Sequence, residues 1–422
     1  MSTVGVVGVE GVVARNVTPA VLESLGDTRV VVVQGARQVG KTTLVSQVVD
    51  RVGGRLVTFD DEVTRGGAQL DPVAFLGQAG DGLLAIDEVQ RVPELVLALK
   101  LVVDRDRRPG RFLLTGSANL LRLPAMQDSL AGRAESVDLF GFSQGELVGR
   151  RERFVDRLLA GEMFVGHDGS LSRADYLDRA CAGGYPEALS RTGRRRAAWW
   201  DNYVRRIVER DAPDVSGLQR LAELPVLLRL LAARNATELN MASLAGDSGI
   251  PVRTLAPYVE LLETLFLVQR IPAWSTNLSK RVVSRPKVAL LDTGLAARLV
   301  NVTPAGAASG ANPAVAGQLL EGFVASELRR QLSWADEDAR LHHYRDHGGA
   351  EVDLVLETGD GRVAGIEVKA TASVSGRDVR WLTQLRDALG PRFVAGVVLH
   401  TGPTAAPFGD RIAAVPMDAL WA

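Results

Sequence analysis

The sequence predicts an α/β protein of several domains, with a parallel β-sheet in its N-terminal third. Three observations carry this expectation. Short apolar segments alternate with helical stretches over the first 120 residues, a glycine-rich loop follows the first of these segments, and a hairpin pattern returns at residues 351–369 after a long helical stretch. At 422 residues the chain is long enough for two or three domains that each bury a core.

Four apolar segments are the predicted strands of the N-terminal sheet. They cover residues 30–33, 56–59, 83–86 and 112–114. Helical patterns between them indicate crossover connections, so we expect parallel strands with helices on both faces. The N-terminal domain is predicted to span residues 1–145.

The segment between the first strand and the following helix has the spacing of a phosphate-binding loop. Its glycines permit a tight turn and the close approach of backbone N–H groups to phosphates, and the helix N-terminus favours an anion. Lys41 is placed to reach the β- and γ-phosphates, and the Thr42 hydroxyl to ligate Mg²⁺. The predicted cofactors are therefore ATP and Mg²⁺, and the predicted contacts are Gly35, Ala36, Arg37, Gln38, Val39, Gly40, Lys41, Thr42 and Thr43.

The third predicted strand ends in two carboxylates, Asp87 and Glu88. Asp87 is expected to hold Mg²⁺ through water, and Glu88 to orient or deprotonate the attacking water. An apolar strand followed by Asp-Glu is often only structural. After a phosphate-binding loop, however, the pair indicates that ATP is hydrolysed and not merely bound.

Two further contacts with the nucleotide are predicted. Ser117, or as second choice Asn119, follows the fourth strand and is placed to touch the γ-phosphate, although a simple turn explains the same residues. Arg133 is a candidate arginine finger that acts on a neighbouring subunit, so a homo-oligomer is expected.

Residues 146–239 read as a helical region in which arginines crowd positions 191–210. Trp199, Trp200 and Tyr203 lie among these arginines. Guanidinium groups for phosphates with aromatic rings for stacking are typical of nucleic-acid binding. A helix with a solvated arginine face and a buried aromatic face fits equally well, and the sequence leaves both open.

Residues 240–302 are predicted to form a winged-helix-like region. Helices are expected at 241–245 and 252–265, with a turn between them and a strand at 267–271. Arg253 is the one cation of the presumed recognition helix around Thr254 and Tyr258, so DNA binding and protein contacts both stay open. The Gly/Ala/Pro-rich residues 303–316 are the predicted linker.

The last predicted domain, residues 316–422, contains a helix at 318–331 and then the hairpin. Because side chains alternate along a strand, Glu351 and Asp353 are expected on one face, and Glu367 and Lys369 likewise. The opposite face is expected to carry Val352, Leu354 and Leu356 with Ile366 and Val368. An ordinary hairpin with one solvated charged face has the same pattern.

Nine segments together resemble a known family. They are residues 35–43, 86–90, 114–117, 129–133, 183–187, 286–288, 292–295, 351–353 and 367–369. Their order and spacing are similar to those of AAA-superfamily P-loop ATPases of bacteria and archaea that carry a C-terminal domain of unknown function. The resemblance implies an AAA-type ATPase core, a winged-helix unit and a small α/β C-terminal domain similar to restriction-endonuclease folds. Gln38 departs from the arginine that many relatives carry.

An Asp, a short hairpin and then Glu-x-Lys is also the layout of the PD-(D/E)xK nucleases. By that resemblance Asp353 and Glu367 would hold Mg²⁺ or Mn²⁺, Lys369 would help activate water, and Glu321 could add a third carboxylate. Nuclease-like folds can lose activity and persist as binding modules, so cleavage itself stays open.

Composition limits the other function classes. The net charge of −1 shows no global attraction to nucleic acid, and the single Cys181 excludes an internal disulfide and favours the reducing cytoplasm. Residues 1–13 lack the basic start of a signal peptide, and no apolar run predicts a membrane span. His342, His343 and His347 show no metal-binding spacing and are expected at a solvated strand end.

The sequence therefore predicts an ATP-hydrolysing protein that couples ATP to a nuclease-like domain acting on DNA or RNA. The alternative is a nucleotide-dependent oligomeric signalling switch that presents its C-terminal half to protein partners without nuclease activity.

Overall fold

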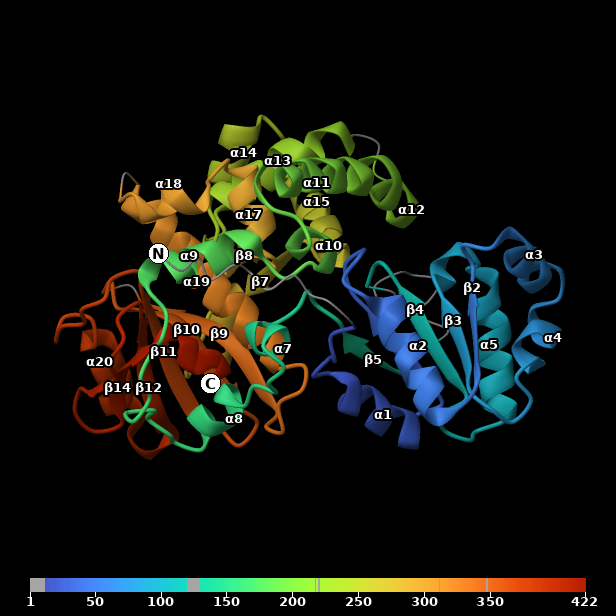
Figure 1. Ribbon diagram of the computed structural model, residues 1–422, viewed down its shortest axis with the longest axis horizontal. Coiled ribbons are helices and arrows are strands. Elements are labelled where there is room, and N and C mark those ends of the chain that lie inside the picture. Colours follow the sequence, from blue (N-terminus) through green and yellow to red (C-terminus); the bar gives the residue numbers. More distant parts are fainter. Residues whose placement is uncertain (1–11, 120–129, 217, 219–220, 311, 347) are drawn as a thin grey trace.

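Two sheet-containing lobes and a helical region make up the molecule (Figure 1). The computed structural model describes residues 12–119, 130–216, 218, 221–310, 312–346 and 348–422. In Figure 1 the blue and cyan N-terminal lobe lies on the right, the orange and red C-terminal lobe at the lower left, and the green helices above. Within the described residues no helix has both the length and the apolar character needed to cross a membrane.

The N-terminal lobe holds five parallel strands in the order β2-β3-β4-β1-β5. The first four confirm the predicted strands. The fifth was missed because its sequence, Ala-Glu-Ser-Val-Asp, alternates polar and small residues at a sheet edge and has no apolar run. The strands are β1 Val30–Gln34, β2 Arg55–Thr58, β3 Leu84–Asp87, β4 Phe112–Gly116 and β5 Ala134–Asp138.

Helices cover both faces of this sheet, as predicted for a parallel arrangement. Val31 and Val33 of β1 pack toward the face covered by α1 and α2, whereas Val30 and Val32 pack toward α5. Burial on both faces explains the continuous valine run of β1. The helices are α1 Thr18–Asp27, α2 Lys41–Val52, α3 Glu62–Leu70, α4 Pro72–Gly77, the short η1 Val89–Arg91 and α5 Glu94–Arg105.

The helical region follows, as predicted. In its longest helix, α11, Trp200 and Tyr203 are buried and pack with Tyr185, while the arginine face is exposed. These two rings are therefore not available for stacking on bases. The elements are α7 Gln144–Leu147, α8 Phe154–Leu159, α9 Arg173–Ala182, α10 Pro186–Leu189, α11 Gly193–Arg206, the π-helix η3 Ile207–Asp211, α12 Ala212–Val215, η4 Leu221–Glu223 and α13 Leu224–Ala233.

The predicted pair of helices and the following strand are present after residue 240. Tyr258 of the second helix is buried, so it belongs to the core and not to a recognition surface. The strand is one edge of an antiparallel sheet in the order β6-β8-β7. The elements are β6 Thr237–Glu238, α14 Met241–Ser248, α15 Val252–Thr264, β7 Val268–Ile271, α16 Leu278–Val283 and β8 Lys287–Leu290.

The segment predicted to be a linker is largely folded. It contains α18 Pro304–Ala308 and the start of α19 Pro313–Gln331, which begins earlier than the predicted helix. Thr303 and Asn312 cap these helices, and a proline opens each one. Both helices pack against α9, and α17 Thr293–Leu299 completes the group. Residues 303–316 therefore extend the core.

The C-terminal lobe is a mixed six-stranded sheet in the order β13-β14-β12-β11-β10-β9. The predicted hairpin is confirmed, with Leu354 opposite Ile366. Helix α20 covers one face, and α19 and α8 pack on the other. The elements are β9 Ala339–Arg345, β10 Glu351–Thr358, β11 Val363–Lys369, α20 Arg380–Leu389, η5 Gly390–Arg392, β12 Phe393–His400, β13 Ala406–Pro407, β14 Ile412–Pro416 and η6 Met417–Trp421.

Two expectations about this lobe were wrong. Val352 does not share a face with Leu354: it packs with Val355 against α20, because one extra residue of β10 between Val352 and Val355 shifts the register against β9. His342 and His343 are buried in the middle of β9 and not at a solvated strand end. The backbone at Ala273 and Trp274 pairs with that of His343, so a further segment lies along this edge of the sheet.

Some predicted features lie outside the described residues. These are Ser129 at the start of one family segment, His347, and residues 1–11 of the N-terminus.

Candidate functional site

The loop between β1 and α2 has the backbone of a phosphate cradle. A side chain at Gly35 would place its Cβ 2.0 Å from the Leu139 carbonyl oxygen, so only glycine fits there. Gly40 has φ 99° directly before α2, which favours glycine, and Gln38 is also left-handed with φ 66°. The helix then starts at Lys41, so the unpaired N–H groups of its first turn open onto the loop.

Lys41 lies inside the loop. Its Nζ donates hydrogen bonds to the carbonyl oxygens of Gly35 at 3.0 Å and Ala36 at 2.9 Å. Burial lowers the pKa of the Lys41 ammonium to about 8, against the opposing effect of the Glu88 and Asp87 carboxylates. A bound phosphate would therefore compete with these two carbonyl oxygens for the Lys41 ammonium.

Arg15 supports the loop from outside and was not identified from the sequence. Its guanidinium donates to the carbonyl oxygens of Val39 at 2.9 Å and Phe140 at 2.6 Å, and its Nε pairs with Glu146 at 3.1 Å. Arg15 is buried although it precedes the first strand. No spacing rule links position 15 to the loop, so only the fold reveals this contact.

Thr42 and Asp87 meet, as predicted. The Thr42 hydroxyl donates to Asp87 Oδ2 at 3.0 Å, and the Thr115 hydroxyl donates to Asp87 Oδ1. Thr115 was missed, because its contact with Asp87 depends on β4 lying beside β3 in the sheet. A threonine hydroxyl and a strand-end carboxylate side by side are the donor set that Mg²⁺ takes beside a nucleotide phosphate. These residues therefore fit the metal.

Glu88 sits one residue further, in a left-handed conformation with φ 58°. Such a backbone is strained for a residue with a side chain and is often found at functional sites. Its carboxylate accepts hydrogen bonds from Gln90 Nε2 and, at 3.3 Å, from the Ser117 hydroxyl. Ser117 is thus beside Glu88, and Gln90 is a missed neighbour. Asn119 instead directs its backbone N–H to Thr264 of α15.

Two predicted arginines form ion pairs within the chain. Arg37 of the loop contacts the buried Asp211 of η3 at 2.6 Å, which ties the loop to the helical region. Arg133 makes a double hydrogen bond to Asp104 of α5, at 2.7 and 2.8 Å. Of the other loop residues, Val39 is buried, and Thr43 is exposed on the first turn of α2.

A second cluster of charge lies in the C-terminal lobe. Lys369 Nζ is 3.4 Å from Glu367 Oε2, and Asp353 Oδ2 accepts a hydrogen bond from the Val368 N–H at 2.9 Å. Asp353, Glu367 and Lys369 therefore come together as predicted. The Oε1 atom of Glu367 is buried and has no hydrogen-bond partner among the described residues.

Lys287 of β8 was not assigned to this cluster. Its buried ammonium lies 2.7 Å from Glu321, 3.1 Å from Glu351 and 3.6 Å from Asp353. Glu321 thus faces the cluster from α19, but its near partner is the lysine. The rarity of lysine in this sequence was the one signal for Lys287.

The cluster holds more acidic groups than lysines, because Glu321, Glu351, Asp353 and Glu367 face Lys287 and Lys369. Burial and the Asp353 carboxylate raise the pKa of Glu321 to about 8. The same two causes raise the pKa of Glu367 well above its usual value. Among the described residues no three His, Cys, Asp or Glu side chains have the geometry of a metal site. A cation here would rest on Asp353 and Glu367 with water, a ligand set that Mg²⁺ accepts.

Comparison with known proteins supports a P-loop domain in the N-terminal lobe. Residues 27–148 match the model of the AAA domain, so the N-terminal lobe is a P-loop domain of AAA type. Residues 173–306 and 316–420 match two domains of unknown function, DUF8612 and DUF4143. The uncharacterized proteins Rv2008c of Mycobacterium tuberculosis and Mb2031c of Mycobacterium bovis are each 31% identical over 409 residues, which is 96% of this chain and 84% of theirs. The chain belongs to the family of these mycobacterial proteins.

Two solved structures match parts of this chain at low sequence identity. The Walker-type ATPase PABY2304 of Pyrococcus abyssi has a TM-score of 0.42 and 17% identity, covering 67% of this chain and 94% of its own. The ORC2 protein of Aeropyrum pernix has a TM-score of 0.35 and 15% identity, covering 74% and 93%.

Proposed function

We propose that the chain is an ATPase that hydrolyses ATP to ADP and phosphate at the β1–α2 loop. The observation that carries the proposal is the contact of Thr42 with Asp87 directly beside the strained Glu88. A loop that only bound Mg²⁺ and a nucleotide would not need a further carboxylate fixed by Gln90 and Ser117.

Each side chain has an assigned task in this proposal. The loop amides and Lys41 bind and orient the phosphates, while Thr42 and Asp87 hold Mg²⁺. When bound, Mg²⁺ neutralises charge on the phosphate oxygens. Glu88 accepts the proton of the attacking water at its carboxylate, and the hydrogen bond from Ser117 fixes the orientation of that carboxylate.

Phosphate release with Mg²⁺ and ATP tests this function. The full chain should turn over ATP, whereas Lys41→Met should reduce kcat/KM by at least about 100-fold because the phosphates lose their cation. Lys280→Met removes an exposed lysine far from the loop and should leave the rate unchanged. Equal turnover by parent and Lys41→Met would refute the assignment.

A second, metal-dependent nuclease function is supported by one specific observation. The buried Oε1 of Glu367 has no hydrogen-bond partner among the described residues, and the neighbouring Asp353 carboxylate raises the pKa of Glu367. A cation would satisfy this oxygen and replace the proton that the raised pKa keeps there. We infer that Asp353 and Glu367 bind Mn²⁺ or Mg²⁺ and that Lys369 assists water in phosphodiester cleavage. The C-terminal lobe, taken as residues 316–422, would then be a restriction-endonuclease-like domain.

Metal binding and cleavage test this second function separately. Calorimetry with Mn²⁺ should show binding that releases protons from the cluster and is lost in Asp353→Asn, while Asp387→Asn, an exposed control, binds normally. Cleavage of single- and double-stranded DNA and RNA should require Mn²⁺ and Lys369. Binding without cleavage would leave a regulatory cation site and exclude the nuclease.

We also propose that the chain works as a homo-oligomer in which Arg133 reaches the nucleotide of a neighbouring subunit. Arg133 would first have to leave Asp104, which holds it through two hydrogen bonds. Asp104→Ala should therefore increase ATP turnover in a concentration-dependent manner, and Arg133→Ala should abolish that increase. Turnover that is independent of protein concentration in both variants would contradict the proposal.

We also propose how the first 302 residues divide into units. Residues 1–145 form the ATPase unit, residues 146–239 the helical lid, and residues 240–302 a winged-helix-like unit. The packing of α14 on α15, and of α15 on β7 of the three-stranded sheet, supports the last of these.

A further inference from the structure

The exposed face of α11 and η3 carries five arginines that have no acidic partner among the described residues. They share solvent exposure and the absence of any hydrogen bond or ion pair from their guanidinium groups to the described residues: Arg194, Arg195, Arg205, Arg206 and Arg210. On a chain with a net charge of −1, this is a local concentration of positive charge.

The helical spacing divides these arginines into two rows. Arg195, Arg206 and Arg210 fall on one row together with Asn202 and no acidic residue. The other row combines Arg194 and Arg205 with Asp201 and Glu209, but Asp201 already holds Arg298 at 2.7 and 2.8 Å. The first row is therefore purely cationic.

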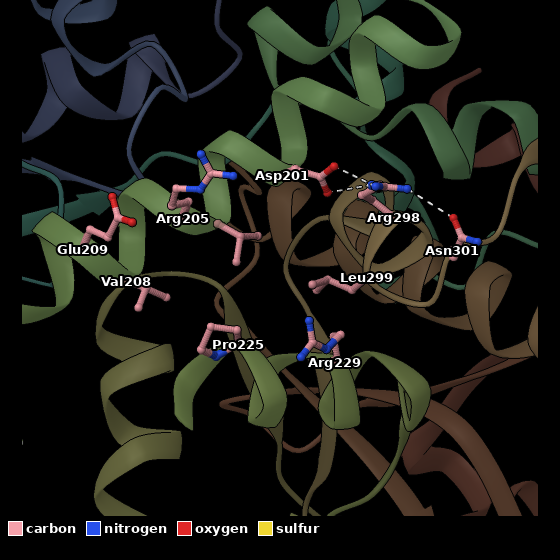
Figure 2. A pocket seen from close by; sticks show the side chains of 10 residues that line it. Asp201, Arg205, Val208, Glu209, Pro225, Arg229, Arg298, Leu299 and Asn301 are labelled. Carbon is pink, nitrogen blue, oxygen red and sulfur yellow. Dashed lines mark hydrogen bonds and ion pairs between the residues drawn. The ribbon is translucent and has the colours of Figure 1, made fainter. Parts of the chain in front are cut away.

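A cleft of about 490 Å³ borders the second row (Figure 2). In Figure 2, Arg205 of α11 and Arg229 of α13 lie on opposite sides of it, and Leu299 lines the cleft near Arg229. Arg229 is exposed and forms no ion pair within the described chain. Glu209 and the Asp201–Arg298 pair also line this cleft. Arg205 and Arg229 form no ion pair with the described residues, and across the partly apolar cleft they suit one nucleotide, with its phosphate between the arginines and its base against the apolar wall.

The surface lacks what a protein partner would require. Within residues 191–211, all of which the structure describes, no large apolar side chain is exposed. Stable protein interfaces have an apolar or aromatic centre, whereas binding to a phosphodiester backbone is driven by release of counterions and needs none.

This surface ends at the ATP loop. Directly after Arg210, the buried Asp211 accepts the hydrogen bond of Arg37 at 2.6 Å. Arg210 and Asp211 lie in the π-helical turn η3, and such widened turns are common at functional sites. A ligand held by Arg206 and Arg210 would therefore act on the same turn that fixes the phosphate loop.

We propose that the arginine face of α11 and η3, together with Arg229, binds the phosphodiester backbone of nucleic acid, and that Asp211 transmits its occupancy to Arg37 of the ATP loop. The transmission rests on the proposed ATPase function, whereas the binding surface does not.

Binding is tested without nucleotide, by fluorescence anisotropy with a labelled 20-nucleotide single strand and the matching duplex at several NaCl concentrations. Replacing Arg195, Arg206 and Arg210 together by Gln should weaken single-strand binding roughly tenfold or more and reduce the slope of log K against log salt by about 2. The matched control replaces Arg51, Arg105 and Arg377 by Gln; these are also exposed and unpaired within the described chain. The control should bind like the parent.

Three results would overturn the surface assignment: no binding by the parent at 50 mM NaCl, equal losses in both triple variants, or equally strong competition by polyglutamate. Arg206→Gln alone should show a smaller loss of single-strand binding. This single variant tests the surface even if the triple variant misfolds. For the transmission, Asp211→Asn should retain binding but lose the increase in ATP turnover that the oligonucleotide produces in the parent. If the parent binds but shows no turnover at all, the ATPase proposal fails while the surface stands.

Discussion

At the scale of single residues, Lys41 determines how ATP binding depends on pH. Its ammonium has a pKa of about 8 because it is buried, and phosphates bind the charged form. Below pH 8 the charge is already present, and above pH 8 binding must take up a proton. We expect uptake of about 0.1 proton by this group at pH 7 and about 0.9 at pH 9, with affinity falling over the same range.

Calorimetry in buffers of different ionisation enthalpy measures this uptake. The Lys41→Arg variant keeps its charge at pH 7 and pH 9, so the difference in proton uptake between the two pH values should disappear. An equal number of protons at pH 7 and pH 9 in the parent would show that Lys41 does not titrate in this range.

Gln90 is a residue whose task follows from geometry alone. Its amide bonds to both Glu88 and Ser117. Gln90→Ala should leave KM for ATP nearly unchanged and lower kcat on the order of tenfold, because the Glu88 carboxylate loses its fixed direction. Gln384→Ala on α20 is an exposed control. A rise in KM with unchanged kcat would instead place Gln90 in nucleotide binding.

The sequence predicts the residues of this site that obey local spacing rules. Lys41, Thr42, Asp87 and Glu88 follow from a loop after a strand and a carboxylate at a strand end, and the structure brings them together. Arg15, Gln90 and Thr115 could not be derived in this way, because their contacts depend on strand order and on the path of the N-terminal segment.

At the scale of elements, Lys287 joins β8 to α19 through Glu321 and to the C-terminal sheet through Glu351 and Asp353. Lys287→Met removes the shared cation and should lower the free energy of unfolding by about 3–5 kcal/mol at pH 8. The loss should be smaller at pH 5.5. In the folded protein the pKa of Glu321 is raised to about 8 from an ordinary 4.5. The stability that comes with its protonation is therefore present at low pH and is lost as the pH rises toward 8. At pH 5.5 Glu321 is protonated and does not need the lysine charge.

Urea unfolding at the two pH values measures this dependence, with Lys280→Met as control. An equal loss at pH 5.5 and pH 8 would mean that the carboxylates of the cluster do not take up protons when the lysine is absent.

The same strands show where pattern-based prediction ends. Alternation correctly predicts the β10–β11 hairpin and the meeting of Asp353 with Glu367 and Lys369. It fails for Val352, because the register shift against β9 reverses the face and nothing in the local sequence marks it. Likewise, the composition of residues 303–316 indicates a linker, although the caps Thr303 and Asn312 start helices there.

At the scale of the whole molecule, one continuous core runs from the phosphate-loop face of the first sheet through the helical region to the C-terminal sheet. We therefore expect Mg²⁺ and ATP to raise the unfolding temperature of the entire chain in one transition, by the equivalent of about 2.7 kcal/mol at 100 times Kd. Differential scanning calorimetry measures it, and Lys41→Met should show no shift. Two transitions of which only one moves would show that the lobes unfold independently.

The order of the large parts is predictable from the sequence because each has its own periodicity, whereas their packing is not. The Arg37–Asp211 and Lys287–Glu321 contacts join segments 174 and 34 residues apart, and single-sequence patterns contain no such information. Both contacts couple the parts that the proposed function requires to communicate.

Glu88→Gln tests the central claim, hydrolysis at the β1–α2 loop, most directly. The full-length variant is incubated with Mg²⁺ and radiolabelled ATP, and the bound nucleotide is identified after rapid filtration, with Glu94→Gln, an exposed glutamate of α5, as the matched control. We expect Glu88→Gln to retain intact ATP with an affinity close to that of the parent, whereas the parent and the control contain ADP. Bound ADP and undiminished phosphate release in Glu88→Gln would contradict it.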